Sequence, residues 1–353
     1  MLLETAALSP YRCTIARDCP GGPPGTCSGG LVGIGCSRCP DGWIVQGDTC
    51  EECGAGATLP LWLFFAAVIV ALIAKYYALA SHRTRNATIL LSTACTLGMT
   101  INAVQVIGVF NKIPFSWPGA YRDILKAFSV LILDLSIFNV DCAIGSSAAK
   151  YFNQVIFFFW VLMLLPAVGL LSQVIPKTFE WWRWTKARLI NVLGAFTSIV
   201  FVTMISVAQI PINCYAHPND LGRSVRAYPD IICGDGGSHN TMLVFCCVSF
   251  LLAGVFYAAC VYAAVSAPKW SADKATGNDF LVATRFLFIR YRVEAWYWGV
   301  FLLMRSLLIA LTPTFVPDEP HAQLIIFCAI FTFFIAMHMR LWPWKVPVLN
   351  VAD

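Results

Sequence analysis

Seven stretches of about twenty mostly apolar residues dominate this sequence. A run of this length lets an α-helix cross the hydrocarbon core of a membrane, which is roughly 30 Å thick. Apolar residues make up 58% of the chain and charged residues only 12%, more apolar surface than one soluble core can bury. We therefore expect an all-α polytopic membrane protein with about seven transmembrane helices, preceded by a small disulfide-rich extracellular domain. The expected spans are 59–80, 87–110, 151–175, 189–211, 241–266, 295–314 and 321–340.

The stretch 121–146 is apolar but interrupted by Asp134, Asn139 and Asp141. One stripe of a helix here, at steps of three and four, carries the acidic residues opposite an apolar face, and consists of Asp123, Lys126, Val130, Asp134, Ile137 and Asp141. This pattern predicts an amphipathic helix in the outer interface or packed upright against the bundle. A purely structural interfacial helix, a vestibule or pore wall that attracts cations, and an eighth span remain as alternatives. The three polar residues are therefore candidate pore or vestibule residues.

Basic residues predict the orientation of the spans. With the N-terminal head outside and 121–146 not crossing, most basic residues between spans lie in inner loops, as the positive-inside rule requires. If 121–146 crossed, the basic loops 176–188 and 267–294 would face outward. We therefore expect an extracellular or lumenal N-terminus and a cytosolic C-terminus, in the plasma membrane or a membrane of the secretory pathway.

The first part of the chain is dense in Cys, Gly and Pro and has almost no apolar periodicity. Such a small domain cannot build a sufficient core and needs covalent crosslinks. The expected domains are a Cys-rich head over 1–57, a transmembrane domain over 58–345 and a shortened cytosolic end over 346–353. The cysteines of the head are Cys13, Cys19, Cys27, Cys36, Cys39, Cys50 and Cys53.

Two Cys-x-x-Cys pairs, at 36–39 and 50–53, have a spacing that also suits tetrahedral zinc in a reducing compartment. The predicted topology places them outside, where thiols oxidise, so we interpret them as disulfide cysteines. Cys214 and Cys233 fall in the loop 212–240, which the same topology places outside, and we expect them to pair as well.

The start of the chain has neither the basic nor the apolar region of a secretory signal. We expect either that the first span carries the head outward as a reversed anchor, or that the chain is a fragment.

Some spans contain polar residues. Arg305 lies within 295–314, where a charge has a partner or faces water, so it is either a structural ion-pair residue or a pathway residue. Asn102 and Gln105 are expected to make helix–helix hydrogen bonds, and His338 to reach the interface as a border residue.

Catalytic and cofactor signatures are not found. Asp235, Ser238 and His239 share one short loop in which nothing orients a nucleophile. There is no phosphate-binding glycine loop, no His-Glu-x-x-His helix and no basic run for nucleic acid. We expect no enzymatic activity, no cofactor, no metal and no nucleic-acid partner.

The head resembles ephrin-receptor-like and laminin-EGF-like modules. The resemblance lies in Cys-Pro-Gly-Gly at 19–22, Pro-Gly-x-Cys at 24–27 and "GIGCSRCPDGWIVQGDTCEEC" at 33–53. It implies the pairs Cys27–Cys36 and Cys39–Cys50. The bonding of Cys53 and of Cys13 or Cys19 stays open, since the number of cysteines is odd.

A second resemblance lies in "FLFIRYRVEAWYWGVFLLMRSLLIAL" at 286–311 and "RLWPWKVPVLNVAD" at 340–353, with the outer loop 211–236. These segments resemble the membrane region of transient-receptor-potential-like proteins of fungi, algae and protists, which are distantly related to polycystins. The residues that carry it are Tyr291, Glu294, Trp296, Tyr297, Trp298, Pro343, Asn350 and Asp353.

This resemblance, over about 120–353, implies a cation channel or a membrane transport component. Two other functions stay open. A seven-span receptor fits the count, with Cys142 near the third span, but the third and seventh spans lack Asp-Arg-Tyr and Asn-Pro-x-x-Tyr. A non-conducting surface or adhesion protein is the other. The expected partners are the lipid bilayer, an extracellular protein bound by the head, copies of the same chain, and inorganic cations if the chain conducts.

Overall fold

The computed structural model of the chain is mostly helical and has five helices long and apolar enough to cross a membrane within the residues it describes. These five are Ser147–Val174, Lys186–Ile212, Ser238–Trp270, Trp298–Phe315 and Pro320–Leu341. The described residues are 19–21, 26–40, 42–46, 49–54, parts of 59–74, 87–110, 147–174, 184–218, 222–234, 236–272, 277–347 and 350.

The five helices coincide with five of the seven expected spans. The second expected span, 87–110, is occupied by the 24-residue helix α2 (Ala87–Phe110), of which Gly98–Val109 is apolar. The first, 59–80, is helical at the residues described there, all of which precede 75. The predicted amphipathic helix 121–146 lies outside the described residues. Helices long and apolar enough to cross a membrane are confirmed at five of the expected positions, and the count of seven stays a prediction.

The chain divides into two compact units. Helices α4 (Ser147–Leu171) and α6 (Ser238–Ala272) begin in the first unit and end in the second, whereas α5 (Lys186–Ala208) runs from the second into the first. The first unit contains 1–64, 135–155 and 207–248, and the second contains 65–134, 156–206 and 249–353.

The first unit holds the disulfide-bonded Cys-rich region and a second small sheet. In the Cys-rich region, β1 (Trp43–Gln46) pairs antiparallel with β2 (Thr49–Glu52), after the short 3₁₀ turns η2 (Ser28–Gly30) and η3 (Ile34–Cys36). The second sheet follows η10 (Ile210–Ile212) and has the order β3-β4-β5. Its strands are β3 (Cys214–Ala216), β4 (Arg223–Val225) and β5 (Tyr228–Ile232), and η3 lies against β5.

A buried tyrosine ties three helices together in the first unit. The Tyr151 side chain of α4 is fully buried, and its hydroxyl oxygen lies 3.3 Å from the carbonyl of Met242 and 3.5 Å from that of Ala208. These carbonyls belong to α6 and α5, so one hydroxyl joins the ends of three spans. In a bilayer such interhelical hydrogen bonds compensate polar groups that lipid cannot satisfy.

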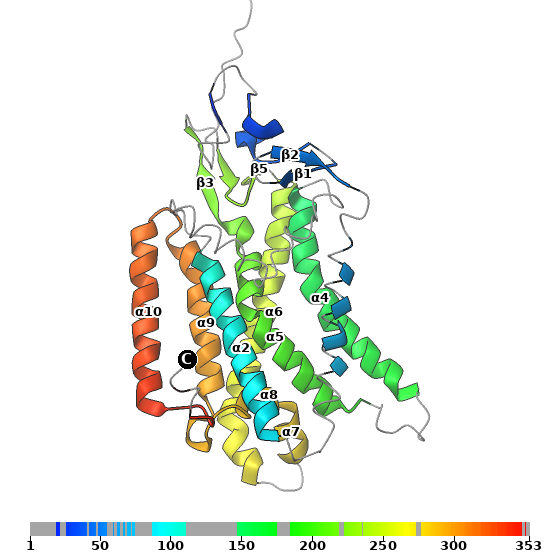
Figure 1. Cartoon of the computed structure of the whole chain (residues 1–353), viewed down its shortest axis with the longest axis vertical. Helices are drawn as coiled ribbons and strands as arrows, with labels where there is room; N and C mark the ends of the chain where they lie inside the picture. Colours follow the sequence, from blue (N-terminus) through cyan, green and yellow to red (C-terminus); the bar gives the residue numbers. More distant parts are fainter. Residues whose placement is uncertain are drawn as a thin grey trace, which may run out of the picture. The chain divides into compact units, whose positions relative to one another are not determined.

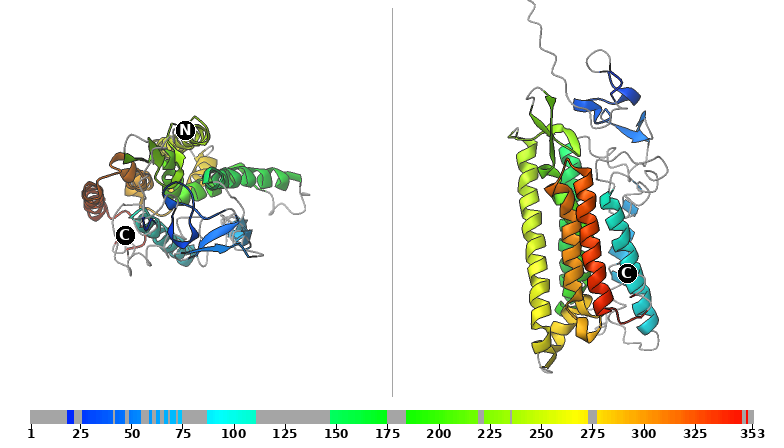
Figure 2. Two further views of the ribbon diagram at one scale, coloured as in Figure 1. Left: turned by 90° about the horizontal axis from the view of Figure 1, so that it is seen from above. Right: turned by 90° about the vertical axis from the view of Figure 1, so that its left-hand side faces the viewer.

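The second unit is a helical bundle in which α9 (Trp298–Phe315) lies against both α2 and α10 (Pro320–Leu341) (Figure 1). The side view in Figure 2 shows the same neighbours. The bundle is completed by parts of α4, α5 and α6, and by the short elements η8 (Ser172–Val174), α7 (Gly277–Ala283), α8 (Arg285–Phe288) and η12 (Val293–Ala295).

Helix α5 is the most enclosed of the five candidate spans. Of its most apolar stretch, 78% is buried, against 50% or less for the other four. By contrast α6 and α10 leave wide apolar faces uncovered, with Leu251 and Ile325 largely exposed. Such faces suit contact with lipid chains, which are as apolar as leucine.

Glycines let α8 approach two helices closely. A Cβ at Gly194 of α5 would overlap the ring of Phe286, and one at Gly299 of α9 would lie 2.7 Å from the Leu287 carbonyl oxygen. The approach is completed by a hydrogen bond of 2.8 Å from the Phe286 N–H to the Asn191 side-chain oxygen, which is buried in α5. Small residues at helix contacts allow such proximity in membranes.

Replacing Gly194 by alanine is expected to destabilise the protein by about 1–3 kcal/mol, because the added Cβ forces the Phe286 ring to move in a packed interior. The matched control is Gly254→Ala in α6, where a Cβ would meet nothing within 4 Å and helix propensity favours alanine by up to about 1 kcal/mol. Thermal unfolding of both variants in the same detergent measures the difference. Equal melting temperatures would contradict the close packing of α8 on α5.

Candidate functional site

A reversal of the chain after α10 builds one end of the second unit. Trp342 adopts a left-handed conformation with φ of +44°, and its N–H donates to the His338 carbonyl at 2.9 Å. The next residue, Pro343, has no N–H and restricts the residue before it, so the helix cannot continue. The chain therefore leaves the helix axis at this point and runs past the residues that precede α9.

The returning segment pairs with the backbone around Tyr291. The Arg292 N–H donates to the Pro343 carbonyl at 2.8 Å, and the Lys345 N–H donates to the Arg290 carbonyl at 3.1 Å. Together these bonds form an isolated antiparallel bridge between Tyr291 and Trp344. The two segments that carry the second sequence resemblance thus meet side by side.

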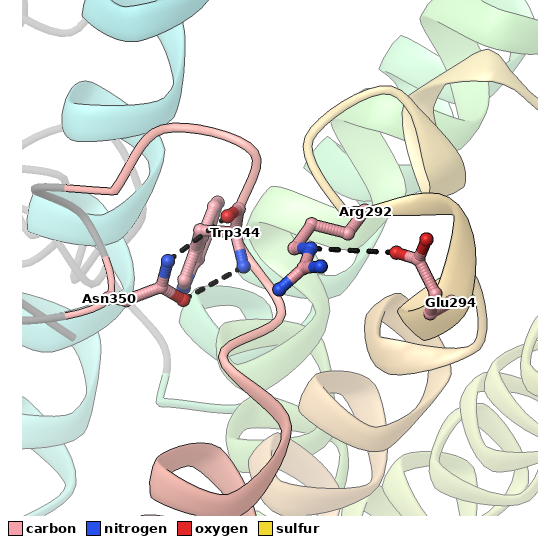
Figure 3. A network of polar contacts seen from close by, with 4 residues as sticks. All are labelled: Arg292, Glu294, Trp344 and Asn350. Carbon is pink, nitrogen blue, oxygen red and sulfur yellow. Dashed lines mark hydrogen bonds and ion pairs between the residues drawn. The ribbon is translucent and has the colours of Figure 1, made fainter.

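Asn350 clamps the same segment with both ends of its side-chain amide (Figure 3). Its Oδ1 accepts from the Trp344 N–H at 2.9 Å, and its Nδ2 donates to the Trp344 carbonyl at 3.0 Å. Asn350 is 6% exposed, so these bonds are shielded from water. The Asn350 side chain therefore makes the two hydrogen bonds to Trp344 that a neighbouring strand would otherwise make, and both backbone groups of Trp344 are satisfied.

An aromatic cluster fills the space under this bridge. Tyr291, Ala295, Trp298 and Trp344 are all buried together, with the Tyr291 and Trp344 ring centroids 5.0 Å apart. Aromatic pairs of this kind add about 0.5–1.5 kcal/mol beyond the area they bury. We call the bridge, the Asn350 clamp and this cluster the Tyr291–Trp344 junction.

The expectation that His338 reaches the membrane interface was wrong. His338 is 7% exposed, its Nε2 lies 3.2 Å from the Asn350 carbonyl oxygen, and its ring meets Trp298 edge to face. The returning segment supplies a hydrogen-bond partner inside the protein, so the ring need not extend toward water.

The junction forms one wall of a cavity of about 80 Å³ inside the second unit. On this measure a single water needs roughly 10–15 Å³, so the cavity has room for a small polar group. Its lining residues come from α2, α5, α8, α9 and the junction. The polar ones are Asn102, Gln105, Ser198, Arg290, Tyr291 and Ser306.

Arg290 reaches this cavity because α2 has a glycine opposite it. A Cβ built on Gly98 would lie 3.1 Å from Nη1 of Arg290, so the guanidinium packs directly on the helix backbone. The junction holds the Arg290 backbone, whose carbonyl is bonded to Lys345. The cation is therefore positioned from both sides.

The polar lining residues differ in how they are satisfied. Gln105 donates to the Ile199 carbonyl of α5 at 2.8 Å, which confirms the helix–helix contact predicted for it. Ser198 donates to the Gly194 carbonyl at 2.7 Å. Within the described part of the chain, the side chains of Asn102, Arg290 and Ser306 have no hydrogen-bond or ion-pair partner. The sequence predicted an interhelical hydrogen bond from Asn102, and its side chain makes none with the described residues.

Of the other polar residues predicted as site residues, the structure describes Arg305 alone. Arg305 lies in α9 and does not line the cavity, and its Nε is buried without a hydrogen-bond partner among the described residues. No described acidic residue forms a salt bridge with it. Asp134, Asn139 and Asp141 lie outside the described residues, so the predicted acidic stripe stays a prediction.

The disulfides of the head have the pairing that the laminin-type resemblance implies. Cys27 bonds Cys36 and Cys39 bonds Cys50. Cys19 and Cys53 are also disulfide-bonded, and Cys13 lies outside the described residues. Because these cysteines are oxidised, the Cys-x-x-Cys pairs are not zinc ligands in this structure.

The predicted Cys214–Cys233 bond joins the start of β3 to the end of β5. His239 brings a ring nitrogen within 4.8 Å of both sulfurs, the one grouping with metal-ligand spacing found in the described residues. However, its Nδ1 accepts from the Gly234 N–H at 3.3 Å, and its Nε2 lies 3.0 Å from the Pro211 carbonyl. A disulfide and a fully hydrogen-bonded imidazole favour a structural role over metal binding.

Comparison with known proteins gave no match to a protein family model, a curated protein or a solved structure. The geometry of the second unit therefore carries the functional argument by itself.

Sequence reasoning did not single out Arg290 or the cavity. Arg290 counts in the sequence only as one of several inner-loop cations, and Gly98 lies on a helix far from it along the chain. Neither residue has a local signal for the other, because the contact depends on how α2 packs beside α9.

Replacing Asn350 by alanine is expected to destabilise the protein by about 1–3 kcal/mol, because two backbone hydrogen bonds of Trp344 lose their partner. Asn350→Asp keeps the acceptor but sets a carboxylate oxygen against the Trp344 carbonyl, so it is expected to be no better than alanine. The measurement is thermal unfolding together with hydrogen exchange of the 344–346 amides.

The control for this pair is Lys345→Ala, which removes an exposed side chain and leaves its backbone bond to Arg290 in place. Its melting temperature and exchange should stay close to those of the parent protein. Unchanged exchange in Asn350→Ala would rule out the clamp.

Low pH is expected to loosen the β3–β5 sheet. Burial lowers the pKa of His217 below its ordinary value of 6.5, and its Nε2 lies 2.8 Å from the Ser224 hydroxyl oxygen. The unfolded segment therefore binds a proton before the folded one, so stability is unaffected above about pH 6.5 and falls as the pH drops below it. The protection of the 214–232 amides, measured relative to their intrinsic exchange rate at each pH, should fall below pH 6.5 in the parent and fall less in His217→Gln. Exposed His321→Gln serves as control, and identical pH profiles for all three proteins would refute the prediction.

Proposed function

We propose that this chain is a channel-like integral membrane protein, a cation channel or transport component of the transient-receptor-potential-like, polycystin-related kind, with an extracellular Cys-rich module. The observation that carries the proposal is the Tyr291–Trp344 junction. The paired residues 290–292 and 343–345, one set from each stretch that carries the resemblance, are separated by the candidate spans α9 and α10, yet their backbones pair directly. Both motifs supply residues to the same backbone pairing, which explains why they occur together in one chain.

The proposed topology has seven spans, with the head outside and the junction at the cytosolic side. The disulfides Cys27–Cys36, Cys39–Cys50 and Cys214–Cys233 all belong to the first unit, and Arg290 and Lys345 belong to the second. The proposed topology puts the oxidised cysteines outside and the loop cations inside, as compartment chemistry and the positive-inside rule require. The plasma membrane or a secretory-pathway membrane is the proposed location.

Polar groups inside the bundle support a transport role. Arg305 lies within a candidate span with its Nε buried and unpartnered among the described residues. Charged side chains at membrane depth are costly, and they commonly face a water-filled path or a partner. We assign Arg305 to the wall of such a path, with Asp134 and Asp141 of the acidic stripe at its outer entrance.

The test is cation flux through the full chain reconstituted in liposomes. Asp134→Asn combined with Asp141→Asn is expected to lower the initial flux about tenfold at low ionic strength, since clefts of one charge raise local counter-ion concentration by about 10-fold or more. The effect should shrink in high salt, where exposed charges are screened.

Asp279→Asn is the matched control, because this acidic residue is exposed on α7 and lies in a proposed inner loop. It should leave flux unchanged. If the parent protein passes no cation, or if all the variants conduct like the parent, the proposed function is wrong.

A further inference from the structure

The cavity of the second unit brings together three donors that the described protein leaves unsatisfied. They are the guanidinium of Arg290, the amide of Asn102 and the hydroxyl of Ser306. Ser306 is only 6% exposed, so bulk solvent does not reach its hydroxyl freely. Asn102 and Arg290 are only partly buried, so water can reach them, but no described protein group accepts a hydrogen bond from any of the three side chains. An acceptor bound in the cavity would therefore find three donors that the described protein does not use.

The cavity is also positively charged. None of the described residues that line it is acidic, and Arg290 is the one cation among them. Its near neighbour Arg292 behaves differently, since it lies at the surface with its Nε 3.5 Å from Glu294 (Figure 3). Two arginines separated by one residue thus have opposite surroundings, one with an acidic partner and one facing the cavity.

The charge is held in place before any ligand arrives. Lys345 bonds the Arg290 carbonyl, the Tyr291–Trp344 bridge fixes the next residue, and Gly98 supports the guanidinium. Gly299, at the first turn of α9, lines the same cavity, so the positive end of that helix dipole adds to the field. A preorganised site loses less entropy when it binds.

We propose that this cavity binds a phosphate-bearing anion, held by Arg290 with Asn102 and Ser306 as further donors. A guanidinium presents its N–H groups in a fork that matches phosphate oxygens, and the anion supplies both the missing acceptors and the missing negative charge. Water in the cavity would supply hydrogen-bond acceptors but no negative charge. The ligand is either the phosphate of a membrane lipid or free inorganic phosphate. Binding here does not require that the chain conducts ions.

The experiment uses the full chain in phosphatidylcholine nanodiscs with two probes. Inorganic phosphate is titrated by calorimetry, and phosphatidic acid added to the discs is followed by native mass spectrometry of the released protein. Retained phosphatidic acid without heat from inorganic phosphate identifies a lipid phosphate, and the reverse result identifies the free ion. If neither probe binds the parent protein, the proposal is overturned.

Arg290→Gln is expected to weaken binding of the active probe about 10-fold or more, because hydrogen bonds to charged groups are the stronger ones. Arg290→Lys keeps the charge but loses the fork, so its affinity should fall between those of Arg290→Gln and the parent. Arg292→Gln removes the same charge two residues away and should leave affinity unchanged. Equal losses in Arg290→Gln and Arg292→Gln would show general attraction to a basic surface and overturn the assigned site.

A second variant protects the test against misfolding. Ser306→Ala removes one donor from within α9 without disturbing helix formation, and is expected to weaken binding a few-fold. Melting temperatures of all the variants are measured in empty phosphatidylcholine discs. If Arg290→Gln does not fold, unchanged affinity in Ser306→Ala overturns the proposal.

Discussion

The backbone hydrogen bonds between residues 290–292 and 343–345 are the interaction on which the second unit depends. Both segments leave helical geometry at the end of a bundle, where their N–H and C=O groups have no intrahelical partners. Lipid offers none, so non-helical backbone near a membrane is tolerated only when protein or water satisfies it. Here each segment satisfies the other, and Asn350 supplies the remaining partner on the far side of Trp344.

This pairing has consequences for packing. Once the strand-like segments are joined, Trp298 and Trp344 share one buried cluster, and α8 is drawn against α5 and α9 at two glycines. The same arrangement directs Arg290 inward onto α2 while Arg292 stays at the surface. A cavity with a fixed cation is therefore a by-product of satisfying the backbone, and it is available for a ligand.

Much of the architecture could be predicted from the sequence because bilayer thickness imposes a length on apolar runs. The predicted spans 241–266 and 321–340 fall inside α6 and α10, which extend only a few residues beyond them. The pairing of the head cysteines could be predicted from the resemblance to laminin-type modules, and their oxidised state from the expected extracellular compartment. The cavity did not follow, because Arg290 and Gly98 meet only through helix packing, and the burial of His338 depends on the Asn350 carbonyl. Periodicity reports which face of a helix is apolar, but not which neighbour covers it.

The order in which the chain is synthesised gives the Tyr291–Trp344 junction a further meaning. Helices α2 and α5 leave the ribosome long before Trp344, so the wall that Trp344 forms is the last part of the cavity to be made. Until residues 343–345 have emerged, the backbone of 290–292 has no pairing partner and the aromatic cluster is incomplete. Domains generally fold in the order of synthesis, and incomplete ones expose surface that chaperones recognise. A chain that stopped before residue 343 would therefore lack both the pairing partner of 290–292 and the wall that Trp344 gives the cavity.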